Sequence, residues 1–126
     1  MNAEELLAAA RAARERAYAP YSTFAVGAAL LCEDGNVYSG CNVENSSFGL
    51  SNCAERTAAF AAVAGGSHRF VAIGIAGPDG ASTPPCGACR QVLAEFGPTM
   101  TVYFTSGDGY ETASLRDLLP AQFELP

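Results

Sequence analysis

Two short stretches of the sequence hold side chains that could do chemistry together. One is CAE, residues 53–55, and the other is PCGAC, residues 85–89. Cys86 and Cys89 are three residues apart, so on a helix they share a face and both sulfurs can reach one ion. Cys53 also stands where a helix is expected to begin, and the positive end of a helix dipole favours the thiolate that a metal requires. The pattern predicts a site with three thiolate ligands.

The number of ligands indicates the kind of metal site. A structural zinc site has four protein ligands, whereas a catalytic site has three and leaves a position for water. Three thiolates make the site negative, and Arg56, one turn after Cys53, is placed to offset this charge by donating hydrogen bonds to the sulfurs. Glu55 is not needed as a ligand. We therefore expect Glu55 to act as general acid and base beside a bound water.

Helices and strands that alternate along the chain must position these residues. Residues 3–17 have apolar side chains at helical spacing, and Asn2 with Glu5 fits a capping box. The further expected elements are a hairpin of strands 24–32 and 37–41, a helix at 52–64, a buried central strand at 69–77, a helix at 86–96, a strand at 101–106, a turn at 106–109, and a short helix at 114–119 capped by Ser114 and Asp117. This alternation predicts an α/β fold with helices on both faces of a sheet.

The composition is that of a single globular domain, residues 1–126. Thirteen acidic residues outweigh seven arginines, there is no lysine, and the formal net charge is -6. This balance argues against nucleic-acid binding and favours a small-molecule partner. The N-terminal stretch has neither the apolar run of a signal peptide nor that of a membrane span. Five cysteines, an odd number, argue against a disulfide framework, so we expect a cytoplasmic protein with free thiols.

Together, the motifs resemble the zinc-dependent deaminases, and most closely the cytidine deaminase family of the small, homotetrameric type. The resemblance covers nearly the whole chain and is carried by PYSTFAVGAAL, GCNVENSSFGLSNCAERTA, PCGACRQVL and LLPAQF. It implies a three-layer α/β/α sandwich around a mixed five-stranded sheet, with one Zn²⁺ per chain. It also implies hydrolytic deamination of cytidine and 2′-deoxycytidine to uridine and 2′-deoxyuridine plus ammonia, in pyrimidine salvage.

Residue by residue, the resemblance implies zinc ligands at Cys53, Cys86 and Cys89, with Glu55 carrying protons between water, the pyrimidine N3 and the leaving amine. The substrate-binding residues that it implies are Phe24, Asn42, Glu44, Ala54 and Phe123.

The resemblance gives most of these substrate-binding residues separate roles. Phe24 would stack on the pyrimidine, and Asn42 with Glu44 would bind the ribose hydroxyls. Phe123 would reach into the site of a neighbouring subunit of a homotetramer. Phe48 stands where the family usually has tyrosine, so a hydroxyl contact to a neighbour's ligand is lost.

Other interpretations of the cysteines are open. Cys41 or Cys32 could be the fourth ligand of a structural site, and the chain would then be a non-catalytic zinc-stabilised module. The C-x-x-C pair could be a redox pair, although Cys53 and Glu55 would then have no role. Among enzymes, a deaminase of a nucleoside-like antibiotic of the blasticidin S type and a polynucleotide-editing deaminase are alternatives. The acidic balance weighs against the second.

Several single residues also have plainer interpretations. Phe24 could be strand core, and Asn42 with Glu44 could be ordinary turn residues. Phe123 could pack on its own subunit. His68, the one histidine, follows two glycines and a serine and is expected to be solvated rather than a ligand.

Overall fold

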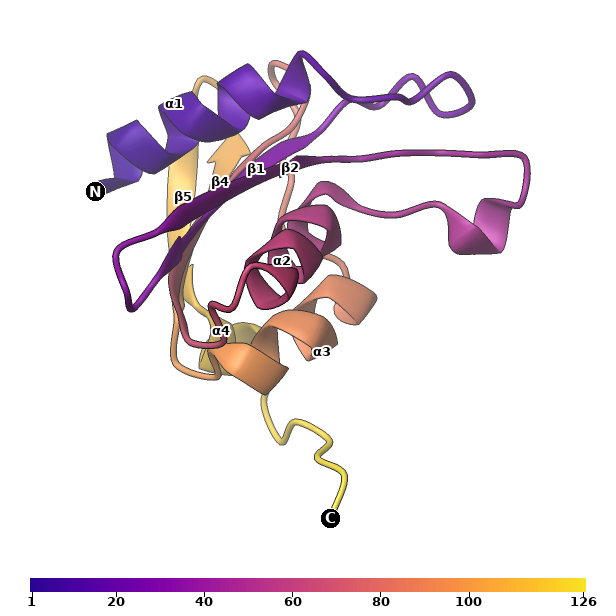
Figure 1. The fold of residues 1–126 in the computed structure, drawn as a ribbon. Helices are drawn as coiled ribbons and strands as arrows, with labels where there is room; N and C mark the ends of the chain where they lie inside the picture. The colour runs from indigo at the N-terminus through magenta and orange to yellow at the C-terminus, as the bar shows by residue number, and fades with distance from the viewer.

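One five-stranded sheet organises the chain. The structure is a computed structural model that describes residues 1–126. Its strand order is β2-β1-β3-β4-β5 (Figure 1). The strands are β1 (Gly27–Cys32), β2 (Val37–Cys41), β3 (Phe70–Ala76), β4 (Thr101–Ser106) and β5 (Gly109–Ser114). β3 and β4 run parallel, and every other neighbouring pair is antiparallel. The sheet is therefore mixed, and β3 has the central position expected for it.

Helices cover both faces of the sheet. They are α1 (Ala3–Arg14), α2 (Ala54–Ala64), α3 (Gly87–Phe96) and α4 (Leu115–Leu118), with a short 3-10 helix at Phe48–Leu50. α1 lies on one face, and α2 and α3 lie on the other (Figure 1). The expected three-layer α/β/α sandwich is confirmed. No helix has both the length and the apolar composition needed to cross a membrane.

Two apolar cores follow from the layers. The smaller has five buried residues and includes Leu6 of α1, and the larger has 17 and includes Leu93 of α3. Strand β1 contributes to both, because Ala28 and Leu30 belong to the larger core and Ala29 to the smaller. Successive side chains of a strand point to opposite faces, so a strand covered on both sides is apolar throughout.

One glycine lets α2 lie close to the sheet. A β-carbon on Gly40 of β2 would lie 2.4 Å from the backbone nitrogen of Ala58 in α2, far inside van der Waals contact. No residue with a side chain could take this place without moving the helix. The close packing therefore sets how near α2, the helix that carries Glu55, lies to the sheet.

The capping box of α1 is present as predicted. Asn2 Oδ1 accepts from Glu5 N at 2.9 Å, and Glu5 Oε1 accepts from Asn2 N at 3.0 Å. The helix ends at Arg14, earlier than expected, because residues 15–17 bond three residues back and so tighten the last turn.

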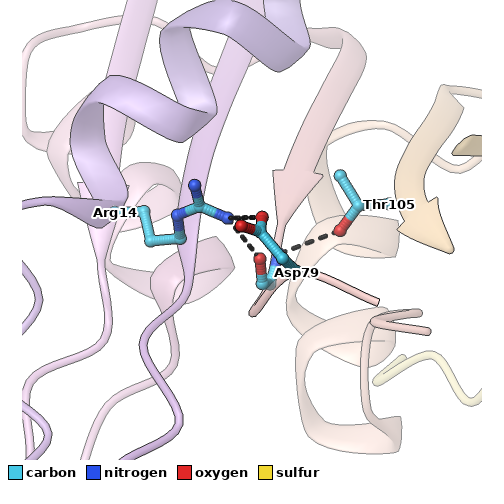
Figure 2. A network of polar contacts seen from close by, with 4 residues as sticks. Arg14, Asp79 and Thr105 are labelled. Carbon is cyan, nitrogen blue, oxygen red and sulfur yellow. Dashed lines mark hydrogen bonds and ion pairs between the residues drawn. The ribbon is translucent and has the colours of Figure 1, made fainter. Parts of the chain in front are cut away.

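Arg14 ties the end of α1 to the loop that follows β3. Its guanidinium donates to the carbonyl of Gly77 and lies 3.4 Å from Asp79 Oδ1, and Gly77 N donates to Thr105 Oγ1 at 3.0 Å (Figure 2). These contacts hold the first part of the loop that leads from β3 to Cys86.

Two further elements begin later than expected. β1 begins at Gly27, because the Val26 nitrogen donates to the Asn42 side chain instead of to a neighbouring strand. α2 begins at Ala54, because the backbone of Asn52 is held in an isolated β-bridge. In both cases a contact with a distant segment takes the backbone out of the regular element.

The C-terminal third differs most from expectation. The residue pattern predicted no strand at β5, whose first four residues are exposed and show no apolar alternation, although the resemblance implied a fifth strand. It pairs with β4 across the predicted turn, where Gly107 has φ +57°. The predicted capping bond of Ser114 with Asp117 is wrong, since Ser114 makes no side-chain capping bond. Its backbone is extended because it is still the last residue of β5.

Candidate active site

The starts of α2 and α3 bring three cysteines together. Cys53 is the N-cap of α2, Cys86 is the N-cap of α3, and Cys89 lies in the first turn of α3. The backbone of an N-cap residue is extended, and neither thiol is used for a capping bond, so both are free for other contacts. The three sulfurs lie within 4.8 Å of one another. The sequence spacing therefore becomes one compact cluster of thiols.

This cluster fits one zinc ion. Thiolates bound tetrahedrally at about 2.3 Å stand about 3.8 Å apart, which small side-chain movements would reach here. Thiolate ligands also favour zinc over hard cations such as magnesium or calcium. No other group of three His, Cys, Asp or Glu side chains in the chain gathers its ligand atoms this closely. The protein thus offers three sulfur atoms to one ion.

Hydrogen bonds stabilise the thiolate form of Cys53. Its pKa is lowered to about 5, because Cys89 and Arg56 both donate to its sulfur. The pKa of Cys89 is raised for the matching reason, since this residue keeps the proton that it shares with Cys53. Arg56 Nη2 lies 3.2 Å from Cys53 Sγ, and the thiolate raises the pKa of Arg56 in return. Arg56 therefore lies where the sequence analysis expected it, against the cluster.

Glu55 is the buried carboxyl beside the cluster. It lies in the first turn of α2 and is only 5% exposed. Burial penalises its charged form and raises its pKa to about 7. A carboxyl that titrates near neutrality can both accept and return a proton. A divalent cation on the sulfurs would lower this pKa, because it would stabilise the carboxylate.

A hollow of about 290 Å³ opens over Cys53, Cys86 and Glu55. This volume suits one small ligand. The lining residues come from several segments: Ser22, Phe24, Val26, Asn42, Glu44, Cys53, Ala54, Glu55, Thr83, Pro84 and Cys86. Four of the five residues predicted to bind substrate are among them, and the fifth, Phe123, is not.

Phe123 lies outside the hollow of its own chain. Its side chain is in the exposed tail after α4, and the residue is 67% exposed. Its carbonyl accepts a hydrogen bond from Gln91 Nε2 at 2.9 Å. The tail runs away from the sheet (Figure 1). The ring is thus accessible to another molecule and is not part of the core of its own chain.

Asn42 holds the segment that carries Phe24. Its Oδ1 accepts from Val26 N at 2.9 Å, and its Nδ2 donates to the carbonyl of Phe24 at 2.7 Å. An amide side chain has two N–H donors and an oxygen that can accept twice. One donor and one acceptor position therefore stay free for a ligand. Phe24 itself is 41% exposed at the hollow rather than buried as strand core.

Glu44 and Ser22 hold the preceding part of the same loop. Glu44 Oε1 accepts from Tyr21 N at 3.0 Å and from Ser22 N at 3.1 Å, and Oε2 accepts from the Ser22 hydroxyl. The hydroxyl oxygen also accepts from Phe24 N at 3.1 Å. These bonds, the one from the Ser22 hydroxyl first, lower the pKa of Glu44.

Sequence reasoning did not single out Ser22. The signal that could have found it is local, because a serine hydroxyl often accepts a bond from the backbone nitrogen two residues ahead, here Phe24. Its second contact, to Glu44, comes from a distant part of the chain and has no sequence signal.

The spare cysteines lie elsewhere. Cys32 is buried in the larger core at the end of β1, and Cys41 is half-buried at the end of β2. Neither belongs to the thiol cluster, and all five cysteines are free. The geometry therefore gives no support to a fourth cysteine ligand. His68 is exposed, as expected.

Comparisons with known proteins agree with this site. Residues 1–105 match the family model described as "Cytidine and deoxycytidylate deaminase zinc-binding region". Two curated relatives are both named cytidine deaminase. That of Sporosarcina psychrophila is 50% identical over 125 residues, covering 98% of this chain and 92% of the relative. That of Halalkalibacterium halodurans is 49% identical over 125 residues, covering 98% and 95%.

A solved structure extends the agreement to three dimensions. The crystal structure of cytidine deaminase from Burkholderia pseudomallei matches with a TM-score of 0.90 at 53% identity, covering 98% of this chain and 100% of that one. Family model, sequence and fold thus agree over nearly the full length. This chain belongs to the cytidine deaminase family.

Proposed function

We propose that this chain is a zinc-dependent enzyme that hydrolyses cytidine and 2′-deoxycytidine to uridine and 2′-deoxyuridine with release of ammonia. The observation that carries the proposal is the buried Glu55 carboxyl, which lies beside three thiols at one hollow. The names of the relatives supply the substrate class.

Glu55 moves the protons of the reaction. Cys53, Cys86 and Cys89 would hold the zinc, which would supply a Lewis acid for activating a water toward C4 of the cytosine. Glu55 accepts a proton from this water and delivers it to N3 of the ring. It then passes the second proton of the water to the amino group, which leaves as ammonia. One water is consumed, and the carboxylate returns to its starting state.

The loop residues orient the nucleoside. The exposed face of Phe24 offers a flat apolar surface for the pyrimidine. Asn42 has one free donor and one free acceptor position, and the Glu44 carboxylate, with about four acceptor positions, uses three. A single sugar hydroxyl can therefore accept from Asn42 and donate to Glu44. A site that needs one hydroxyl accommodates both ribose and 2′-deoxyribose.

The active protein is proposed to be a homotetramer with its sites at subunit interfaces. Several large apolar side chains are exposed in the single chain, and their contact with water is unfavourable unless another subunit covers them. Phe48 is 71% exposed, Leu50 75%, Phe123 67% and Leu125 82%. Phe123 would complete the hollow of a neighbour. Phe48 contributes only apolar surface there, since it has no hydroxyl.

We propose the cellular compartment and the metabolic role of the enzyme from its chemistry. The free thiols suit a reducing compartment, which favours the cytoplasm. Deamination of free nucleosides is a reaction of pyrimidine salvage. We also propose that residues 1–126 form one catalytic domain, because one sheet spans the chain from Gly27 to Ser114.

The test is a cytidine assay with metal analysis. The wild-type chain with one zinc should lower the absorbance near the nucleobase band, and Glu55→Gln should be slower by about 10²- to 10⁴-fold with the same zinc content. Glu95→Gln, which changes an exposed acid on α3, is the matched control and should keep full activity.

Three outcomes would contradict the proposal. A zinc-loaded Glu55→Gln protein that works at the wild-type rate would remove Glu55 from the mechanism. Turnover of blasticidin S without turnover of cytidine would change the substrate class. Bound zinc with no turnover of either compound would make the chain a non-catalytic zinc-stabilised module.

A further inference from the structure

Of the three cysteines, Cys86 has the least support from packing. Cys89 is buried and Cys53 is half-buried against Arg56, whereas Cys86 is exposed. It follows an irregular loop, residues 77–85, which ends in two prolines. Proline has no N–H group, so this end of the loop has no backbone donor of its own. Hydrogen bonds can hold it only through its carbonyl oxygens.

Arg90 of α3 donates to these carbonyls. Its Nε donates to the carbonyl of Pro85 at 2.7 Å, and its backbone nitrogen donates to the carbonyl of Cys86 at 2.9 Å. The two carbonyls lie on either side of the Cys86 α-carbon. No other hydrogen bond reaches the backbone of Pro84 or Pro85. One residue therefore fixes both peptide groups that determine where the Cys86 thiol points.

The same guanidinium also reaches α4. Its Nη1 donates to the carbonyl of Leu118, the last residue of that helix, at 2.8 Å. Arg90 forms no ion pair with a carboxylate. A planar guanidinium holds two acceptors in one fixed geometry, which the single ammonium of lysine cannot do. Arg90 thus ties the loop in front of Cys86 to the C-terminal helix.

We propose that Arg90 is a positioning residue for the metal ligand Cys86 and links α4 to the metal centre. It is not among the residues that line the hollow, so it acts through the Pro85 and Cys86 backbone. Without its side chain, the Pro85 peptide loses its hydrogen bond, and the exposed thiolate of Cys86 is free to leave the metal more often. The inference rests on the proposed function only in that the cluster binds zinc.

The test measures zinc release rather than turnover. Zinc-loaded wild type, Arg90→Gln, Arg90→Lys and Arg116→Gln are mixed with an excess of a chromogenic chelator. Arg116 is an exposed arginine of α4 whose side chain makes no hydrogen bond or ion pair, so its variant removes the same charge without the contacts. Arg90→Gln should release zinc about 10- to 100-fold faster than wild type, the range typical for partners of metal ligands. Arg90→Lys should be intermediate, and Arg116→Gln should match wild type.

A second measurement separates positioning from a general loss of stability. Each variant loaded with Co²⁺ reports the geometry of its thiolates by absorption, and far-UV circular dichroism reports its fold. A changed Co²⁺ spectrum in folded Arg90→Lys supports the proposal. Zinc release and Co²⁺ spectra equal to wild type in Arg90→Lys would overturn it, even if Arg90→Gln does not fold. Wild type that holds zinc but does not deaminate cytidine would refute the proposed function and leave this inference standing.

Discussion

The two ends of the hollow are built in different ways. The metal end consists of Cys53, Glu55, Cys86 and Cys89. The loop end consists of Ser22, Phe24, Asn42 and Glu44. Helix starts place the metal end, so regular backbone geometry decides where its side chains lie. Hydrogen bonds between side chains and an irregular backbone place the loop end.

The difference concerns how many tasks each side chain has. At the metal end, each thiol or carboxyl has one proposed task and is held by a rigid element. At the loop end, the amide of Asn42 and the carboxylate of Glu44 also hold the loop in place. Changes at the metal end should therefore stop turnover without altering the loop, whereas changes at the loop end should alter the affinity for substrate and the shape of the loop together.

The largest expected effect is that of removing zinc. A chelator should reduce turnover by more than about 10³-fold, because the reaction loses its Lewis acid. The fold should remain, since neither apolar core includes a cysteine of the cluster. Turnover and far-UV circular dichroism, measured before and after addition of one Zn²⁺ per chain, check both parts. Unfolding of the metal-free chain would show that the metal end is structural.

The second largest effect on turnover is expected for Asn42→Ala. This change removes the bonds to the carbonyl of Phe24 and to the nitrogen of Val26 and so releases the segment that carries the Phe24 ring. Two lost hydrogen bonds should lower kcat/KM by about 10- to 100-fold, mainly through KM. Zinc content should not change. Steady-state kinetics with metal analysis measures both, and a loss of zinc would mean that the two ends are not independent.

A smaller effect is expected for Ser22→Ala. The change leaves Glu44 with its two backbone donors and should raise KM by about 3- to 10-fold. Because the Ser22 hydroxyl is the first cause of the lowered pKa of Glu44, its loss raises that pKa. The ionised carboxylate is present above this pKa and is lost as the pH falls through it. The pKa of the Glu44 carboxyl, followed by NMR, should therefore be higher in Ser22→Ala than in wild type.

Ser22→Thr is the matched control, since it keeps the hydroxyl. It should restore both KM and the lowered pKa of Glu44. An equal Glu44 pKa in wild type and Ser22→Ala would show that the hydroxyl does not act on Glu44.

Almost no effect is expected for Cys41→Ser. Cys41 lies outside the cluster, so zinc content and kcat/KM should stay within about 2-fold of wild type. Loss of zinc from this variant would support the alternative interpretation, in which Cys41 is the fourth ligand of a structural zinc site. The measurement is therefore a direct check that three cysteines suffice.

The metal end could be predicted from sequence because its spacing is local. The spacing of three residues from Cys86 to Cys89 is close to one helical turn, and a cysteine before an alanine-rich segment marks the start of α2. The hydrogen-bond partners at the loop end could not be predicted from sequence, because Ser22 and Glu44 are distant in the sequence and meet only in the folded chain. β5 was missed because a strand exposed on an edge needs no apolar pattern to pair with β4.

The most direct test of the account is X-ray absorption spectroscopy of the zinc-loaded chain. Three sulfur ligands at about 2.3 Å and one lighter oxygen or nitrogen ligand at about 2.0 Å are expected, because the cluster leaves one position for water. Four sulfur ligands would contradict the central claim, since a closed zinc site has no place for a reacting water.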